Sequence, residues 1–418
     1  MADQVRRIGL SLGADLCWPL WFEQVLDKLD LSLPIDGDSV RFEVERVTIE
    51  PYDLNQETNY DVVLDRLSHW MMTSREWVKK AILMDGVYVL NNPWSFQSME
   101  KHTSYCAMMR LGLPVPKTLM VPPKDHEPSD DLRPTLERYA QMFDLGDLGR
   151  KVGFPLFIKP YDGGAWRGVT RIADESQLQE SYDKSGQLVL HFQEAVEPFE
   201  HFVRCVGMGP QLRVMRYDPS KPHHDRYQVT RNFVSDEESR LIQDMTLTIN
   251  GFFGWEFNSC EALLREGTWH PIDYANACPD SQVTSLHYHF PWLVLAKLRW
   301  ALYCAATKRS MRLNLDWQPY FDVVDAEPDL PLKERLSRFA DITRQRFDAE
   351  PFAEFCEEHL GHLPEVAREF VSSDAARDAI RQKVASLFPE HEVDEYTELF
   401  CGRVASWLAE EGPEKMEP

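Results

Sequence analysis

The stretch "GFPLFIKPYDGGAWRGVTRI", Gly153 to Ile172, brings a lysine to the point where a buried strand meets a glycine-rich loop. The apolar run 154–158 predicts a strand, and Lys159 follows it directly. A lysine in that position is costly unless its charge is used or reaches water. Glycines let backbone N–H groups approach an anion, so the pattern suits a phosphate site. It is equally consistent with an ordinary turn beside a surface lysine. The phosphate-loop patterns G-x-x-x-x-G-K-[ST] and G-x-G-x-x-G are absent.

Further along, "LHFQEAVEPFEHFVRCV" places Glu194 at the end of an expected strand, before the apolar pair Ala195 and Val196. A carboxylate and backbone groups at such a strand end suit the edge of an adenine ring. Glu197 or Glu200 suits ribose hydroxyl groups, although each glutamate is also consistent with a solvated strand end. The segment therefore predicts a nucleoside pocket only in combination with the lysine and the glycine loop.

A hairpin is expected over "FNSCEALLREGTWHPIDYANACPDSQ", where "EGT" joins two strands. It brings Glu261 and Asp273 onto neighbouring strands, with Asn276 close by. Two carboxylates and an amide form an oxygen-rich site of the kind that holds Mg²⁺ on phosphate oxygens. Two unrelated exposed acids in an acidic protein are the alternative. Arg204, inside an apolar strand, needs an acidic partner or a phosphate.

This order of motifs resembles the ATP-grasp superfamily of carboxylate–amine and carboxylate–thiol ligases, over about residues 1 to 300. The resemblance rests on a lysine in "MEKHTSYCAMMRLGLPVPKT", the strand lysine in "FPLFIKPYDGG", then "QEAVEPFE" and the hairpin with acid, acid and Asn. It implies that Lys101 and Lys159 contact the phosphates of ATP. It also implies a loop over the γ-phosphate, from Asp162 through Gly163 and Gly164 to Gly168.

The resemblance further implies that Glu194 and the following Ala195 and Val196 form the adenine pocket, and that Glu197 or Glu200 binds the ribose. Two Mg²⁺ ions are expected, held by Glu261, Asp273 and Asn276. Arg204 matches a phosphate-directed arginine of some members.

The metal motif departs from the family pattern in two ways. The family usually ends this site as Glu-x-Asn, whereas "DYAN" separates Asp273 from Asn276 by one residue more. Asp273 therefore needs a β-bulge to serve as a ligand, or Tyr274 displaces it. The first acid is Glu261, where an aspartate is commoner.

The segment "TSLHYHFPWL" beyond the metal strand is expected to border the acceptor site. If it is extended, His287 and His289 lie on one face and can orient a carboxylate or accept a proton. Arg299 is a further candidate to bind a substrate carboxylate. Histidines that merely fill space beside a helix anchored by the segment's aromatic residues are the alternative.

The expected fold is α/β and of the ATP-grasp type. Strand and helix alternate over residues 1–115 and predict a parallel, doubly wound domain. Short strands with turn signals predict two α+β lobes that clamp ATP, the smaller at 116–195 with the glycine loop and the larger at 196–330 with the metal site. Apolar residues at helical spacing predict a helical extension at 331–418.

Composition limits the partners. The formal net charge is −23 and no Lys or Arg run occurs, which disfavours nucleic acid and anionic membrane surfaces. No apolar run is long enough to cross a membrane. Eight cysteines without a Cys-x-x-Cys pair favour reduced thiols in a cytoplasm. A homodimer is one arrangement that the helical extension would serve.

The sequence thus predicts a ligase that joins a small-molecule or peptide carboxylate to an amine through an acyl phosphate, with release of ADP and phosphate. A kinase or a thiol ligase on the same ATP site, and a non-catalytic ATP-binding regulatory protein, remain alternatives. A dinucleotide-dependent oxidoreductase is disfavoured because its glycine fingerprint is missing.

Overall fold

The computed structural model describes residues 3–35, 37–127, 129–139, 143–162, 167–276 and 278–416. The chain forms two compact units. Unit 1 comprises Met1–Phe96, Val203–Ser259 and Ala277–Pro418, and unit 2 comprises Gln97–Phe202 and Cys260–Asn276. The domain boundaries near 115, 195 and 330 stay predictions.

A five-stranded sheet with the order β2-β3-β1-β4-β5 opens unit 1. Strand β1 runs parallel to β3 and β4, and β4 runs parallel to β5, which confirms the expected parallel domain. The edge strand β2 is antiparallel to β3 and was not predicted. The elements of this part are β1 (Asp3–Ser11), α1 (Cys17–Leu29), β2 (Ser32–Ile35), β3 (Asp38–Arg46), β4 (Val62–Asp65), α2 (Met72–Asp85) and β5 (Tyr88–Leu90).

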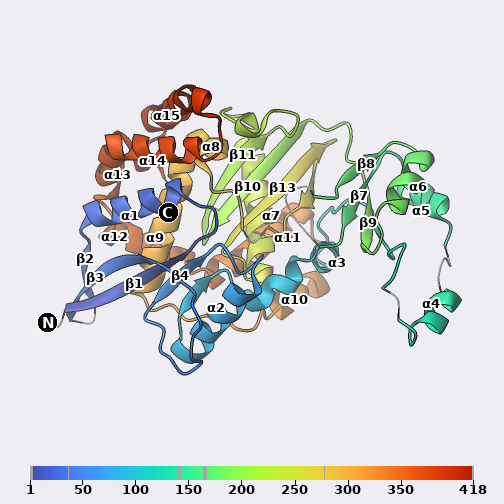
Figure 1. Cartoon of the computed structure of the whole chain (residues 1–418), viewed down its shortest axis with the longest axis horizontal. Coiled ribbons are helices and arrows are strands. Elements are labelled where there is room, and N and C mark those ends of the chain that lie inside the picture. Colours follow the sequence, from blue (N-terminus) through green and yellow to red (C-terminus); the bar gives the residue numbers. More distant parts are fainter. Residues whose placement is uncertain are drawn as a thin grey trace. The chain divides into compact units, whose positions relative to one another are not determined.

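Helices cover both faces of this sheet, as Figure 1 shows for α1 and α2. Helix α2 buries Trp77, Val78 and Ile82 in one cluster with Val63 of β4 and Val89 of β5. Helix α1 contacts β3, and α9 (Phe290–Ala306) contacts β1 and β4. Burial of such alternating apolar layers is the main stabilising contribution to a doubly wound sheet.

The rest of unit 1 contains an antiparallel group of strands and the helical C-terminal region. In the group, β10 pairs with β11 and β11 pairs with β12. Strand β13 (Phe257–Arg265) begins in unit 1 and ends in unit 2. The other elements are β10 (His201–Met208), β11 (Gln211–Tyr217), β12 (Tyr227–Gln228), α7 (Asp236–Phe253), α8 (Val283–Leu286), α10 (Gln318–Ala326), α11 (Leu332–Arg346), α12 (Ala349–His359), α13 (Leu363–Val371), α14 (Asp374–Ala385) and α15 (Val393–Glu410), with short 3₁₀ turns at Pro93–Met99, His223–Asp225, His287–His289, Glu390–Glu392 and Pro413–Lys415.

The apolar spacing that predicted the C-terminal helices corresponds to their buried faces. Leu336 and Phe339 of α11 are buried, and Ala376, Ile380 and Val384 of α14 are buried. Leu387, also expected on that face, lies beyond the end of α14 and is exposed.

Unit 2 is built on an antiparallel sheet with the order β6-β9-β7-β8, covered by α5 and α6 (Figure 1). Its core joins residues of all six elements, among them Val121, Val152, Ile158 and Phe192. The hairpin of β13 and β14 completes the unit. The elements are α3 (Lys101–Arg110), β6 (Thr118–Val121), α4 (Arg133–Tyr139), α5 (Leu145–Val152), β7 (Leu156–Pro160), β8 (Thr170–Ile172), α6 (Glu175–Asp183), β9 (Leu190–Glu194) and β14 (Thr268–Asp273).

Candidate functional site

Strand β7 delivers Lys159 to the polar side of the unit 2 sheet. Because side chains alternate along a strand, Leu156 and Ile158 enter the core while Phe157 and Lys159 take the other face. Lys159 is only 7% exposed, yet its Nζ donates to Gln193 Oε1 at 2.6 Å and to the backbone oxygen of Ile272 at 3.1 Å. The charge therefore stays inside the unit and is held by polar partners.

The β13–β14 hairpin contains the bulge that the sequence required. Glu261 faces Asp273 directly, but the next partner of β13, Ala262, faces Pro271, so Ile272 is the extra residue. Its carbonyl is turned out of the ladder and accepts from Lys159 and from the hydroxyl of Tyr105 at 3.1 Å. The bulge thus brings both acids opposite each other and supplies an acceptor for the lysine.

Tyr274 takes no part in this acid pair. It is 1% exposed, and its hydroxyl donates to the backbone oxygen of Ser104 at 3.2 Å. The hydroxyl of Tyr274 is thus engaged with α3, and the choice between Asp273 and Tyr274 at the metal stays a prediction. The bulge lies at Ile272, just before Asp273, whose side chain is 35% exposed at the surface of the site.

Helix α3 contributes the second lysine. It begins at Lys101, and Nζ of this side chain lies 3.6 Å from Oδ2 of Asp273, with only 4% of the residue exposed. Two buried lysines therefore converge on one hairpin strand, Lys159 on the carbonyl of Ile272 and Lys101 on the carboxylate of Asp273. Buried cations of like sign repel each other, so the arrangement favours an anionic ligand.

The electrostatics agree with this geometry. Burial lowers the pKa of Lys159 to about 8; the charge of Asp273 opposes the shift and that of Lys101 deepens it. Burial, with the nearby His102, Lys101 and Lys159, also lowers the pKa of His191 to about 4. His191 pairs with Lys159 across the strands and is therefore neutral at physiological pH.

A cavity in unit 2 joins these groups to the expected adenine pocket. It is lined by Lys159, Gln193, Glu194, Val196 and Asp273, among others. Glu194 ends β9 as expected, and its carboxylate lies 3.1 Å from Nη2 of Arg265. Ala195 and Val196 are buried behind it. Glu194 and Val196, two of the residues implied for the adenine pocket, thus share one cavity with Lys159.

The two candidate ribose acids have other partners in unit 2. Arg171 donates to both carboxylate oxygens of Glu197, at 3.0 Å and 2.7 Å. Glu200 accepts from the backbone N–H of Glu266 at 3.0 Å, which supports the tight turn of the hairpin. Their roles toward a ribose stay predictions.

The structure describes only part of the glycine loop. Gly163 and Gly164 fall within 163–166, which lie outside the described residues. Asp162 is exposed, and Gly168 has a φ of 71°, where a Cβ would meet Cγ of Pro160 at 2.7 Å. Glycine is therefore required where the loop rejoins the sheet.

The donor set fits Mg²⁺ in part. Glu261, Asp273 and Asn276 all belong to unit 2, and the first two face each other on the hairpin. Among the described residues no group of three or more His, Cys, Asp or Glu side chains is arranged to hold a metal. Two carboxylates and an amide suit a hard cation that takes its remaining ligands from phosphate oxygens and water.

Sequence comparison finds one similar ligase. The chain is 24% identical over 248 residues to a D-alanine–D-alanine ligase of Porphyromonas gingivalis, covering 54% of this chain and 63% of that one. The chain thus spans less than two thirds of the curated relative it matches. No protein-family model matches it. The similarity to this ligase supports the resemblance to the ATP-grasp superfamily.

Solved structures with a related fold include a RimK domain ATP-grasp protein from Sphaerobacter thermophilus, 12% identical with a TM-score of 0.47, covering 70% of this chain and 97% of that one. A D-alanine–D-alanine ligase from Bacillus anthracis is 12% identical with a TM-score of 0.44, covering 82% and 99%. The VanG D-Ala:D-Ser ligase from Enterococcus faecalis is 14% identical with a TM-score of 0.43, covering 81% and 100%.

The remaining predicted residues belong to unit 1. Nη1 of Arg204 donates to the hydroxyl of Tyr227 at 2.7 Å, and the guanidinium lies over the rings of Tyr217, at 4.4 Å, and Tyr227, at 5.4 Å. Cation–π contacts of this kind stabilise a partly buried charge. Its phosphate-directed role stays a prediction.

The expectation of an extended segment around the two histidines is wrong. His287–His289 is a 3₁₀ turn between α8 and α9, so the two rings do not share a strand face. Both residues are buried, at 1% and 6% exposure. His289 Nδ1 accepts from Nε of Arg213 at 2.9 Å, and burial lowers the pKa of His287 to about 4. Burial also lowers the pKa of His289, so its neutral ring orients Arg213 without a bound substrate. The roles of both histidines at an acceptor site stay predictions.

Arg299 is also buried, at 6% exposure, in the fully buried helix α9, and its guanidinium lies 5.7 Å from the ring centre of Phe352. Its proposed contact with a substrate carboxylate stays a prediction.

Unit 1 also contains a buried charge cluster that sequence reasoning missed. Nε of Arg66 lies 3.4 Å from Asp15, its Nη1 donates to the backbone oxygen of Pro279 at 2.8 Å, and Lys297 donates to Ser281 at 2.9 Å. Burial alone would raise the pKa of Asp15, but Arg66 and Lys297 lower it on balance. Nothing in the local patterns links residues 15, 66 and 297, so only the fold brings them together.

Proposed function

We propose that the chain is an ATP-dependent ligase that joins a carboxylate to an amine, with release of ADP and phosphate. The observation that carries the proposal is the convergence of the buried Lys101 and Lys159 on the bulged strand that bears Asp273 opposite Glu261. Two cations beside two carboxylates suit a polyphosphate bound with divalent metal.

In the proposed reaction the substrate carboxylate attacks the γ-phosphorus of ATP, and the bond to the β-phosphate oxygen breaks to give an acyl phosphate and ADP. The amine then attacks the acyl carbon, phosphate leaves with the C–O bonding electrons, and the amine loses a proton. Lys101 and Lys159 hold the phosphate oxygens and stabilise the charge that passes to ADP. The protein contributes positioning more than covalent chemistry.

Mg²⁺, if held by Glu261, Asp273 and Asn276, would neutralise phosphate charge and so favour attack by an anionic nucleophile. The cavity lined by Glu194 and Val196 would take the adenine, with Gln193 holding Lys159 in position through its 2.6 Å hydrogen bond.

We further propose that the Asp15–Arg66–Lys297 cluster binds charged groups of the substrates. Buried ionic groups cost free energy unless they are well paired, and the two Arg66–Asp15 contacts, both 3.4 Å, are long for a bidentate pair. Amino-acid-like substrates carry both an ammonium and a carboxylate group, which this cluster complements. The matched relative is a D-alanine–D-alanine ligase by name, and that enzyme's substrates are consistent with this class.

The test is turnover with defined mixtures of amino acids and dipeptides, ATP and Mg²⁺. ADP release is followed by a coupled assay and the products by mass spectrometry, with Lys159→Met as the inactive control. A new amide with stoichiometric ADP supports the ligase. A phosphorylated substrate indicates a kinase, and a thioester in the presence of thiols indicates a thiol ligase. If ATP binds but no mixture supports turnover, the result indicates a non-catalytic ATP-binding regulatory protein.

The role of the charge cluster is tested by Asp15→Asn, which should raise KM for the acid or amine and leave KM for ATP unchanged.

The cytoplasmic location, the absence of nucleic-acid and membrane partners, and a homodimer stay predictions. No helix of the described residues is both long and apolar enough to span a membrane.

A further inference from the structure

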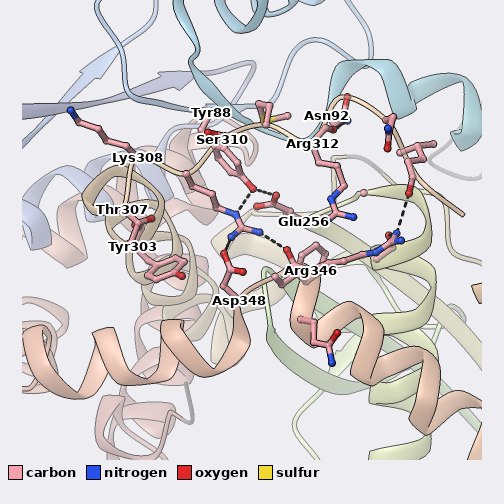
Figure 2. A pocket seen from close by; sticks show the side chains of 18 residues that line it. Tyr88, Asn92, Glu256, Tyr303, Thr307, Lys308, Ser310, Arg312, Arg346 and Asp348 are labelled. Atoms are coloured by element: carbon pink, nitrogen blue, oxygen red, sulfur yellow. Dashed lines mark hydrogen bonds and ion pairs between the residues drawn. The ribbon is translucent and has the colours of Figure 1, made fainter. Parts of the chain in front are cut away.

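A second, larger cavity lies wholly within unit 1 and shares no lining residue with those assigned to ATP (Figure 2). Its volume is about 390 Å³, within the range of small-molecule sites. It is lined where three helices end: the α7 end at 251–256, the α9 end and following loop at 303–315, and the α11 end at 345–348. Tyr88 and Asn92 complete the wall.

The acidic residues of this cavity are already neutralised. Arg309 donates to the hydroxyl of Tyr88 at 2.8 Å and forms an ion pair with Asp348. Tyr88 and Trp300 donate to the two oxygens of Glu256, the latter at 2.6 Å, and burial raises the pKa of this carboxyl group. Figure 2 shows Tyr88, Glu256 and Asp348 of this network close together, with its contacts as dashed lines.

Arg346 fixes the far end of the basic loop. Its side chain is 7% exposed, and Nη1 donates to the backbone oxygens of Gly251 at 3.2 Å and Leu315 at 3.1 Å. Gly251 lies in the last turn of α7, where a helix carries partial negative charge. These contacts account for the buried position of the Arg346 side chain. Asp316 lies 3.6 Å from its Nη2 as the acidic partner.

Arg312 has no such explanation. It lies on the same loop, which is held by the bond from Asn92 Nδ2 to the Arg312 backbone oxygen at 2.8 Å and by Val89 N–H on Met311 Sδ at 3.2 Å. Its side chain is exposed and forms no hydrogen bond or ion pair with any other residue within the described ranges. In Figure 2 it extends from the loop into the cavity on the side of Arg346, whereas Lys308 points away from the cavity.

The positive charge of Arg312 therefore stands beside a second, buried guanidinium in a chain of formal net charge −23. Together with burial, it contributes to lowering the pKa of Arg346. Like charges on a fixed loop are costly, and an anion placed against them would remove that cost. The neutral groups of Ser310, Asn314 and Gln345 on the same wall offer hydrogen bonds to the rest of such a ligand.

We propose that this cavity binds a small ligand with an oxyanion group, a carboxylate or a phosphate, held by Arg312 and oriented by the polar wall. The site is separate from the proposed ligase reaction, because none of its lining residues is assigned a role in binding ATP or the ligase substrates. An arginine that recognises an oxyanion with two N–H donors, in a preformed cavity, is a common form of such sites.

The experiment is a calorimetric titration of the full chain, in buffer without phosphate or carboxylate, with inorganic phosphate, glycerol 3-phosphate and citrate as probes. The variants are Arg312→Gln, Lys308→Gln as the matched loss of charge on the same loop, and Lys159→Met to remove phosphate binding at the ATP site. We expect at least one probe to bind the wild type, with affinity kept in Lys308→Gln and Lys159→Met and lowered at least about tenfold in Arg312→Gln.

Preference for citrate or for the phosphate probes identifies which oxyanion the site takes. The proposal is overturned if no probe binds up to about 10 mM, a weak-binding range for small ligands. It is equally overturned if Arg312→Gln binds as the wild type does, if Lys308→Gln loses as much affinity, or if Lys159→Met abolishes the binding. Because Arg312 is exposed, its variant should fold normally, and its melting temperature checks this.

Discussion

ATP affinity should fall as Lys159 loses its proton at alkaline pH. Burial lowers the pKa of this lysine to about 8 in the ligand-free protein, with Asp273 opposing the shift and Lys101 adding to it. A group with that pKa is about nine-tenths protonated at pH 7 and about one-tenth protonated at pH 9. If only the charged form binds phosphate, the Kd for ATP rises about tenfold over this interval. The energy is available, because a charge-assisted hydrogen bond contributes about 1.5–3 kcal/mol.

The assay is a titration of Mg-ATP at constant ionic strength between pH 7 and pH 9.5. Lys159→Arg keeps the positive charge at every pH in this range and should give a flat profile. Lys101→Arg keeps Lys159 and should retain the inflection near pH 8. A flat profile for the wild type, or the same inflection in Lys159→Arg, would refute the reasoning.

The same lysine gives a second readout in the stability of the protein. Its folded-state pKa lies below the unfolded value of about 10.4, so between the two values the unfolded chain binds more protons and the free energy of unfolding rises with pH. Lys159→Met lacks this contribution. The stability difference should therefore move in favour of the wild type by up to about 3 kcal/mol between pH 7 and pH 10.5. Hydrogen bonds lost in the variant add a constant offset and do not change this slope.

Four further variants test the site and the fold. Tyr105→Phe removes one of the two donors to the Ile272 carbonyl and should lower the free energy of unfolding by about 1 kcal/mol in urea titrations; an unchanged midpoint would mean that this bond contributes nothing. Glu261→Gln and Asp273→Asn should each raise the Mg²⁺ concentration for half-maximal turnover, and wild-type behaviour of Asp273→Asn alone would exclude Asp273 as a ligand. Gly251→Ala should destabilise the protein by about 1–3 kcal/mol, because its Cβ would lie 2.2 Å from Oγ1 of Thr343; a thermal scan matching the wild type would contradict this.

The parts of the fold that the sequence predicted are those with strong local patterns. The strand before Lys159 and the hairpin around Glu266 were correct. Glu266 and Gly267 both adopt positive φ, 52° and 74°, as a two-residue hairpin turn requires. A bulge was also expected from the long spacing between Asp273 and Asn276, and the structure has one at Ile272, just before Asp273.

The errors have a common physical origin in tertiary context. All seventeen residues of α9 are buried, so the helix lacks the amphipathic period by which helices are recognised, and the alternation around Tyr288 suggested a strand instead. The edge strand β2 is short and pairs antiparallel in an otherwise parallel sheet. The Asp15–Arg66 pair joins residues 51 positions apart, which no local pattern links.

The central claim is that a substrate carboxylate attacks ATP. It is tested most directly by turnover with a mixture of acids labelled with ¹⁸O in the carboxyl group, followed by mass analysis of the released phosphate. If an acyl phosphate forms and an amine displaces phosphate, one labelled oxygen leaves the acid with each phosphate, and the label should be absent without ATP, without an amine or in Lys159→Met. Phosphate released by the wild type without any ¹⁸O would contradict the account, because its oxygen would then have come from water.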